Sequence, residues 1–194
     1  MRPWERRTTP QRSPYEGHAL PYGPFARHDT VSLAGNALGQ HPQKRAGFWF
    51  SAGLGYGSLG CQDCGSREGG PSGNISLGGT LSQKVLLGAS SNAWVKSESG
   101  TTLTVSTLTA AIRFYPSATG GFFLMGGLGL GTVSASVSGL GSASETGAGA
   151  LVGLGYDIRV GRNVSLTPYW NGFAMNSSND DANVGQLGLA ITVH

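Results

Sequence analysis

The residues of this sequence that could carry out chemistry are few, and the first of them form a pair. Cys61 and Cys64 are the only cysteines and have the spacing of a C-x-x-C motif. The four histidines lie within the first 41 residues or at position 194, so no second pair of ligands completes a zinc site. No helix is expected after the pair, and a redox C-x-x-C motif needs one to lower the pKa of its thiol. We therefore expect a disulfide between Cys61 and Cys64 that closes an exposed loop in an oxidising compartment.

A second candidate group consists of Arg113, Asp157 and Arg159, which lie in a region with few charges. The alternating patterns described below place all three on the inward-facing side of the strands, close to short turns. Isolated charges in a protein interior need partners, so we expect a structural ion-pair cluster, and coordination of a solute is the alternative. The stretch 55–60 also matches G-x-G-x-x-G. A nucleotide-binding loop must lead into a helix, however, and none is predicted there.

The elements that would position these residues are predicted to be β-strands. From Ala46 onward, apolar residues recur with a period of two instead of the 3.6 of a helix. Eight segments show this alternation, and they begin near residues 48, 74, 85, 107, 122, 148, 164 and 186. Between them, short turn-like stretches alternate with longer polar stretches, the latter at 60–72, 97–100, 138–144 and 175–184. Short turns at one end and longer loops at the other are typical of a transmembrane β-barrel.

The composition indicates which face of these strands would meet lipid. The chain holds 33 glycines, and only 12% of its residues are charged. One face of the strands carries the large apolar residues, and the other is mainly Gly, Ser, Thr and Asn. Small residues fit inside a narrow barrel, whereas a water-facing surface built of them would be poorly charged and prone to association. The apolar face is therefore expected to face outward, with aromatic anchors near strand ends at Phe48, Tyr56, Phe114, Phe122, Tyr156 and Trp170.

The first 45 residues differ from the rest of the chain. They contain seven basic and three acidic residues and six of the nine prolines, without any periodicity. This composition predicts a disordered extension, and residues 46–194 are expected to form the barrel domain. No export signal is discernible near the start of the sequence. A start codon assigned at the wrong position would explain both observations. A basic segment could also bind nucleic acid, but a solvated extension is the interpretation we favour.

Residues 46–194 resemble the small outer-membrane β-barrel family of OmpA-like and OmpW-like proteins. The resemblance rests on the opening segment 47–57 (GFWFSAGLGYG), its internal echoes at 127–131 and 153–156, and the closing segment 188–194 (GLAITVH). It implies an eight-stranded transmembrane barrel in the cell outer membrane, which contacts outer-membrane lipid and is inserted by the barrel-assembly machinery. That machinery reads an apolar final strand that usually ends in an aromatic residue. This chain ends in His194 with Val193 in the apolar phase, so the signal departs from the family pattern.

These observations predict an all-β, eight-stranded antiparallel up-and-down transmembrane β-barrel with a disordered N-terminal extension. No Ser-His-acid arrangement, metal-ligand set or cofactor motif is discernible, so we expect a non-enzymatic protein without a cofactor. A barrel of eight strands is filled by its own side chains, which disfavours a wide channel. The expected role is structural or depends on surface binding by the loops, as a monomer without a nucleic-acid partner. The alternative is a soluble lipocalin-like barrel that carries a small apolar ligand.

Overall fold

The strands of this protein close into a single barrel in the computed structural model, which describes residues 44–61, 65–178 and 181–194. The strands, in chain order, are β1 (Phe48–Cys61), β2 (Glu68–Ser82), β3 (Val85–Glu98), β4 (Thr101–Phe114), β5 (Phe122–Val137), β6 (Gly141–Tyr156), β7 (Ile158–Arg159), β8 (Val164–Asn176) and β9 (Asp181–Val193). Among the described residues, no helix is long and apolar enough to cross a membrane.

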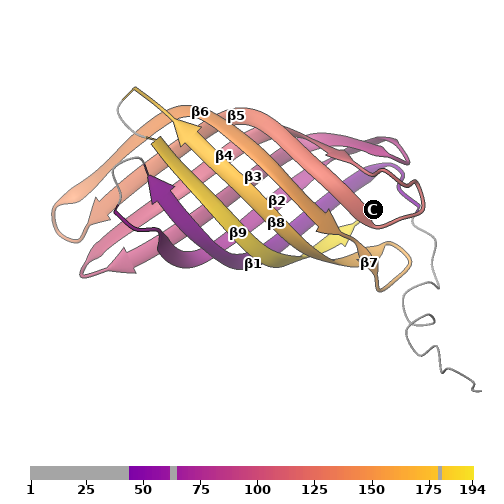
Figure 1. The fold of residues 1–194 in the computed structure, drawn as a ribbon, viewed down its shortest axis with the longest axis horizontal. Coiled ribbons are helices and arrows are strands. Elements are labelled where there is room, and N and C mark those ends of the chain that lie inside the picture. Colours follow the sequence, from indigo (N-terminus) through magenta and orange to yellow (C-terminus); the bar gives the residue numbers. More distant parts are fainter. Residues whose placement is uncertain (1–43, 62–64, 179–180) are drawn as a thin grey trace, which may run out of the picture. The chain divides into compact units, whose positions relative to one another are not determined.

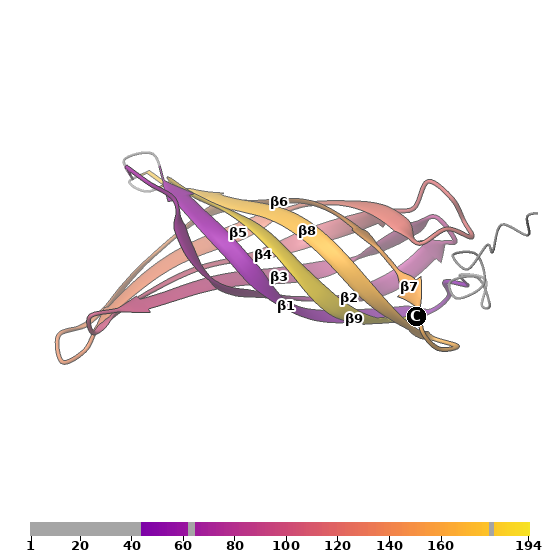
Figure 2. The ribbon, with the colours of Figure 1, turned by 60° about the horizontal axis from the view of Figure 1, so that its bottom comes forward.

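Apart from β6 and β7, consecutive strands pair antiparallel along the chain, and β1 pairs with β9 to close the barrel (Figure 1). The short β7 continues β6 after an interruption at Asp157, and both pair with β8. The nine elements therefore form eight barrel strands, which confirms the predicted all-β, up-and-down architecture. Figure 2 shows the strands wrapping obliquely around the barrel, with the short turns at the end where the chain terminates.

The two faces of the strands carry different residues, as the alternation predicted. Large apolar side chains face outward, where Leu54 is 79% exposed and Leu128 is 75% exposed. Successive side chains of a strand point to opposite sides of the sheet, so one face of every strand meets the barrel exterior. An apolar exterior of this extent requires a lipid environment. The six predicted aromatic anchors all lie on this exterior, from Trp170 at 39% to Phe48 at 66% exposure.

The interior of the barrel is filled by its own side chains. Trp49, Trp94 and Phe123 are among the large residues buried in one apolar cluster. Polar side chains occupy the middle of the lumen and bond to one another. The side-chain oxygen of Asn92 accepts hydrogen bonds from Asn171 (3.2 Å) and Gln186 (3.0 Å). This filling follows from the small radius of an eight-stranded barrel and disfavours the lipocalin-like alternative, which needs an interior cavity for its ligand.

The predicted loops are shorter in the structure than the sequence indicated. The stretch 138–144 contains a three-residue turn and the first four residues of β6, and 97–100 contains the end of β3 and a two-residue turn. β1 also continues to Cys61 and β9 begins at Asp181, so strands enter the other two predicted loops. The expectation was wrong because pairing requires only backbone groups, and a strand that leaves the lipid does not need apolar residues.

Several cross-strand glycine pairs in the wall allow neighbouring strands to approach closely. Gly78 and Gly88 are partners across β2 and β3, and Gly55 and Gly188 are partners across β1 and β9. A Cβ atom on Gly88 would lie 2.0 Å from the backbone oxygen of Leu77. These positions therefore tolerate no side chain without displacement of the neighbouring backbone.

We predict that Gly88→Leu destabilises the barrel by about 3 kcal/mol, because the added side chain forces β2 and β3 apart. The free energy of unfolding in detergent micelles, from urea titration, measures this effect. Gly79→Leu is the matched control, since Gly79 is exposed and has open space around its Cβ position. Equal stability of the Gly88 variant and the control would show that the close approach is not required.

Candidate functional site

The short-turn end of the lumen contains a hydrogen-bonded cluster around Asp157, the residue that separates β6 from β7. The Tyr115 hydroxyl donates a hydrogen bond of 2.8 Å to Oδ2 of Asp157. The Thr167 hydroxyl donates to Oδ1 at 2.7 Å, and Nε2 of His194 lies 3.2 Å from Oδ2. All four residues are buried. The cluster joins the ends of β4, β6, β8 and β9.

Arg113 lies at the same end of the lumen and stacks on aromatic rings. Its Cζ atom is 4.6 Å from the ring centroid of Trp49 and 4.5 Å from that of Phe123. The side chain is only 2% exposed, and its Nε and Nη1 atoms have no hydrogen-bond partner among the described residues. Cation–π contacts compensate part of the loss of hydration, and the charge of Arg113 acts on Asp157.

Arg159, the third residue of the predicted cluster, bonds to backbone oxygens instead. Its guanidinium donates to the backbone oxygens of Arg162 (2.9 Å) and Lys44 (3.2 Å). The structure therefore places Arg113 and Asp157 together inside the barrel, while Arg159 binds the segment that precedes β1. The ion-pair cluster of all three residues stays a prediction.

Arg45 belongs to the same end of the barrel and was not predicted as a site residue. Its guanidinium stacks on Tyr115 at 3.5 Å and donates to the backbone oxygens of Gln83, Ala118 and Gly120. The Gln83 side chain also bonds to both backbone groups of Arg45, at 3.0 and 2.7 Å. Arg45 is thus 1% exposed and links the β2–β3 and β4–β5 turns. The only signal in the sequence was a basic residue directly before the first strand.

The protonation states within this cluster follow from burial and neighbouring groups, and both titrating residues lie just beyond strand ends. Burial alone would raise the pKa of Asp157, but the hydrogen bond to His194 and the charge of Arg113 hold it below its ordinary value. Burial raises the pKa of Tyr115 to about 12. Asp157 is therefore an anion that accepts hydrogen bonds, and Tyr115 is a neutral donor at physiological pH.

The contacts within this cluster indicate a structural role at the short-turn end of the lumen. A buried His–Asp pair orients the base in many hydrolases, but there the second ring nitrogen faces a nucleophile. Here Nδ1 of His194 has no hydrogen-bond partner among the described residues. Across the described ranges, no group of three or more His, Cys, Asp or Glu side chains could hold a metal ion. Together with Arg45, the groups Arg113, Tyr115, Asp157, Thr167 and His194 are called the basal cluster below.

The predicted disulfide lies outside the described part of the chain. Cys64 and the Cys61 side chain fall in the undescribed segment between β1 and β2, so the disulfide stays a prediction.

Two solved structures share this architecture. Neisserial surface protein A matches with a TM-score of 0.62 and 18% sequence identity, over 78% of this chain and 99% of that one. Ail, the attachment invasion locus protein of Yersinia pestis, matches with a TM-score of 0.56 and 15% identity, over 77% of this chain and 99% of that one. No family model and no curated protein matches the sequence.

The closed wall, the apolar exterior and the filled lumen define a small transmembrane β-barrel. At the level of the fold, the chain is an eight-stranded barrel of the outer-membrane type, which confirms the resemblance to OmpA-like and OmpW-like proteins.

We predict that Asp157→Ala lowers the free energy of unfolding by about 3 kcal/mol, because it leaves the buried Tyr115 and Thr167 hydroxyls without their acceptor and removes the anion that balances the buried charge of Arg113. Urea titration in detergent micelles measures the change. Glu98→Ala provides the control, since the exposed Lys96–Glu98 pair is screened by solvent and contributes little to stability. Equal free energies of unfolding for the two variants would show that the basal cluster does not stabilise this end of the barrel.

The Asp157 carboxylate should also make the free energy of unfolding depend on pH. Because the pKa of Asp157 is lower in the folded state than its ordinary value of 3.8, its contribution is fully present above that pH. This contribution is lost as the pH falls through the lower folded-state pKa. Between about pH 5 and about pH 2, the wild-type barrel should therefore lose more stability than Asp157→Asn. If the free energies of unfolding of the two proteins changed equally with pH, this assignment would be contradicted.

Proposed function

We propose that this chain is a non-enzymatic protein of the cell outer membrane that contacts molecules outside the cell. The contact region is the part of β3 to β6 that extends past the apolar band, which we call the strand extension. Support comes from the unequal length of the strands at the loop end. Figures 1 and 2 show the β3–β4 and β5–β6 hairpins reaching further from the barrel than the neighbouring strands.

The register of the strands defines where this extension begins. β6 pairs with β8 only over Ala148–Gly155, whereas its pairing with β5 continues to Gly141. β3 pairs with β2 as far as Trp94 and with β4 as far as Glu98. The strand extension is therefore a four-stranded sheet with two open edges. Open edges of this kind are compatible with water but not with lipid.

Hydroxyl groups cover the outward face of the strand extension, and this observation carries the proposal. Above Leu108 on β4 and Leu130 on β5, the outward positions hold serine and threonine in place of apolar residues. Cross-strand pairing arranges these residues in rows: Ser97, Thr102, Thr104, Ser106, Thr132, Ser134, Ser136, Ser142, Ser144 and Thr146. Two of the cross-strand pairs bond to each other, Ser97 with Thr102 at 2.8 Å and Thr132 with Thr146 at 3.1 Å. A flat face of uncharged hydroxyls is suited to hydrogen bonding with neutral, hydroxyl-rich molecules.

The non-enzymatic role and the outer-membrane location rest on the structure of the barrel itself. A non-enzymatic role is supported by the His194–Asp157 pair, which faces no nucleophile among the described residues. Location in an outer membrane is supported by the fold and by the apolar exterior. Insertion by the barrel-assembly machinery accompanies that location.

The test shortens the strand extension without changing the barrel. Residues 134–144 are replaced by Asn-Gly, which joins the cross-strand partners Val133 and Glu145 through a two-residue turn. Cells that display this variant should attach to dextran-coated surfaces about tenfold less than cells with the wild-type protein, a change of about 1.4 kcal/mol.

The control replaces only the turn 138–140 by Asn-Gly and keeps the strands. It should attach like the wild type, because the proposal assigns contact to the hydroxyl face and not to the hairpin tip. Heat-dependent mobility on SDS gels verifies that both variants fold. Undiminished attachment of the shortened variant would refute the proposed function.

A further inference from the structure

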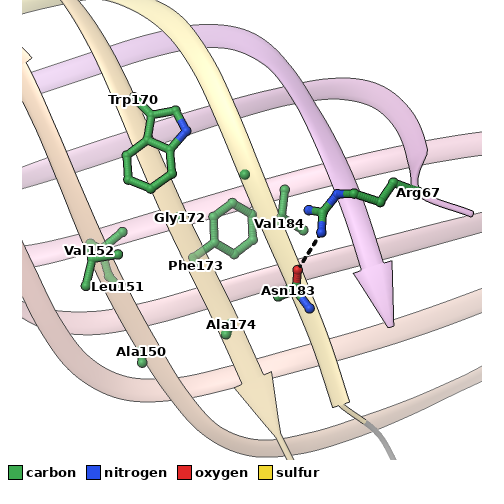
Figure 3. Close-up of a pocket in the computed structure, with 11 residues that line it drawn as sticks. Arg67, Ala150, Leu151, Val152, Trp170, Gly172, Phe173, Ala174, Asn183 and Val184 are labelled. Carbon is green, nitrogen blue, oxygen red and sulfur yellow. Dashed lines mark hydrogen bonds between the residues drawn. The ribbon is translucent and has the colours of Figure 1, made fainter. Parts of the chain in front are cut away.

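The outer wall of the barrel contains a groove where β6, β8 and β9 meet. Gly172 and Gly185 occupy outward positions on β8 and β9. Because glycine has no side chain, the backbone of these two strands forms the floor of the groove. The groove has a volume of about 300 Å³, at the lower end of the range for ligand sites. Val152 and Ala174 line its sides, and Figure 3 shows Trp170 and Arg67 at its two ends.

The groove lies at the upper boundary of the apolar band. Towards the short turns, the outward residues of β9 are apolar, beginning with Leu187, which is 66% exposed. Towards the loops, the next outward residue after Gly185 is the exposed Asn183, and the polar Ser58 of β1 is the cross-strand partner of Gly185. One end of the groove therefore faces acyl chains, and the other end faces the head-group region of the outward leaflet.

Arg67 is held over the polar end of this groove. Its Nη1 atom donates to the side-chain oxygen of Asn183 at 3.0 Å (Figure 3), and its Nε atom donates to Oγ of Ser58 at 3.0 Å. Its Nη2 atom donates to the backbone oxygen of Ser58. Gly60 leaves space for the guanidinium, because a Cβ atom there would lie 2.6 Å from Nη1. The side chain is thus fixed by both β1 and β9.

Among the described residues, no carboxylate forms an ion pair with Arg67. In the described ranges, the ion pairs are Lys96 with Glu68, Lys96 with Glu98, and His194 with Asp157. The two terminal nitrogens of Arg67 each donate one hydrogen bond, so two further N–H groups are available. A guanidinium presented in this way matches the oxygens of a phosphate group.

We propose that this groove is a binding site for one phosphate-bearing lipid of the surrounding membrane. The phosphate binds Arg67, and one acyl chain lies in the groove over Gly172 and Gly185 against the Trp170 indole. The positive charge of Arg67 favours a lipid with an anionic head group. The space left by Gly172 and Gly185 favours an acyl chain that lies along the barrel wall. This site is independent of the strand extension and of the proposed function.

The test uses the full chain in an uncharged detergent and native mass spectrometry with phosphatidic acid as the probe. The wild-type protein should retain one lipid molecule. Arg67→Gln should bind it about fivefold more weakly, since it loses an exposed charge-assisted hydrogen bond. Gly185→Leu should weaken binding to a similar extent, because its side chain occupies the groove while its Cβ atom lies 4.0 Å from the nearest neighbour, Nε1 of Trp170.

Two control variants match these changes at other places. Arg162→Gln removes an exposed arginine at the short-turn end, and Gly126→Leu adds a side chain at another outward glycine with open space. Both should retain the lipid as the wild type does. Diacylglycerol with the same chains should bind more weakly than phosphatidic acid, and inorganic phosphate should not displace the lipid.

Three results would overturn the proposal. They are unchanged binding by Arg67→Gln and Gly185→Leu, equal retention of diacylglycerol, and displacement of the lipid by inorganic phosphate at equal concentration. Heat-dependent gel mobility of each variant separates loss of the site from loss of the fold.

Discussion

The pairing of β1 with β9 is the constraint on which the rest of this structure depends. A strand in lipid has no water to satisfy its backbone groups, so every strand in the apolar band must have a partner on each side. Closure with eight strands satisfies this requirement but leaves a narrow interior. The position of nearly every large and small residue in the barrel follows from that geometry.

The narrow interior explains the composition of the chain. Trp49, Trp94 and other large side chains are buried in the lumen, so many of the remaining inward positions hold small residues such as glycine, serine or asparagine. Gly57, for example, has space for no Cβ atom because the Trp94 ring would lie 2.8 Å away. The low charge has the same origin, since neither lipid nor a filled lumen accepts an unpaired ion. The charged residues that remain inside are stacked or hydrogen-bonded.

The strands and their orientation could be predicted because the period of two is a local property of the sequence. The contacts of Arg45 could not be predicted in this way, since its partners are 38 to 75 residues away and are mostly backbone oxygens. The position of Arg67 depends on the register that brings Ser58 near Asn183, which alternation does not specify. The length of the strand extension was missed because serine and glycine outside lipid form strands and loops equally well.

The basal cluster joins the two ends of the barrel sequence. Arg45 precedes β1 and His194 follows β9, and they are connected through the stack of Arg45 on Tyr115 and the bonds of Tyr115 and His194 to Asp157. The bonds of Asp157 to Thr167 and His194 join neighbouring strands and need no closure. The connection from Arg45 to His194, however, is complete only after the first and last strands meet. That part of the cluster therefore favours the closed state over open intermediates, and we expect it to slow the separation of β1 from β9 more than it accelerates assembly.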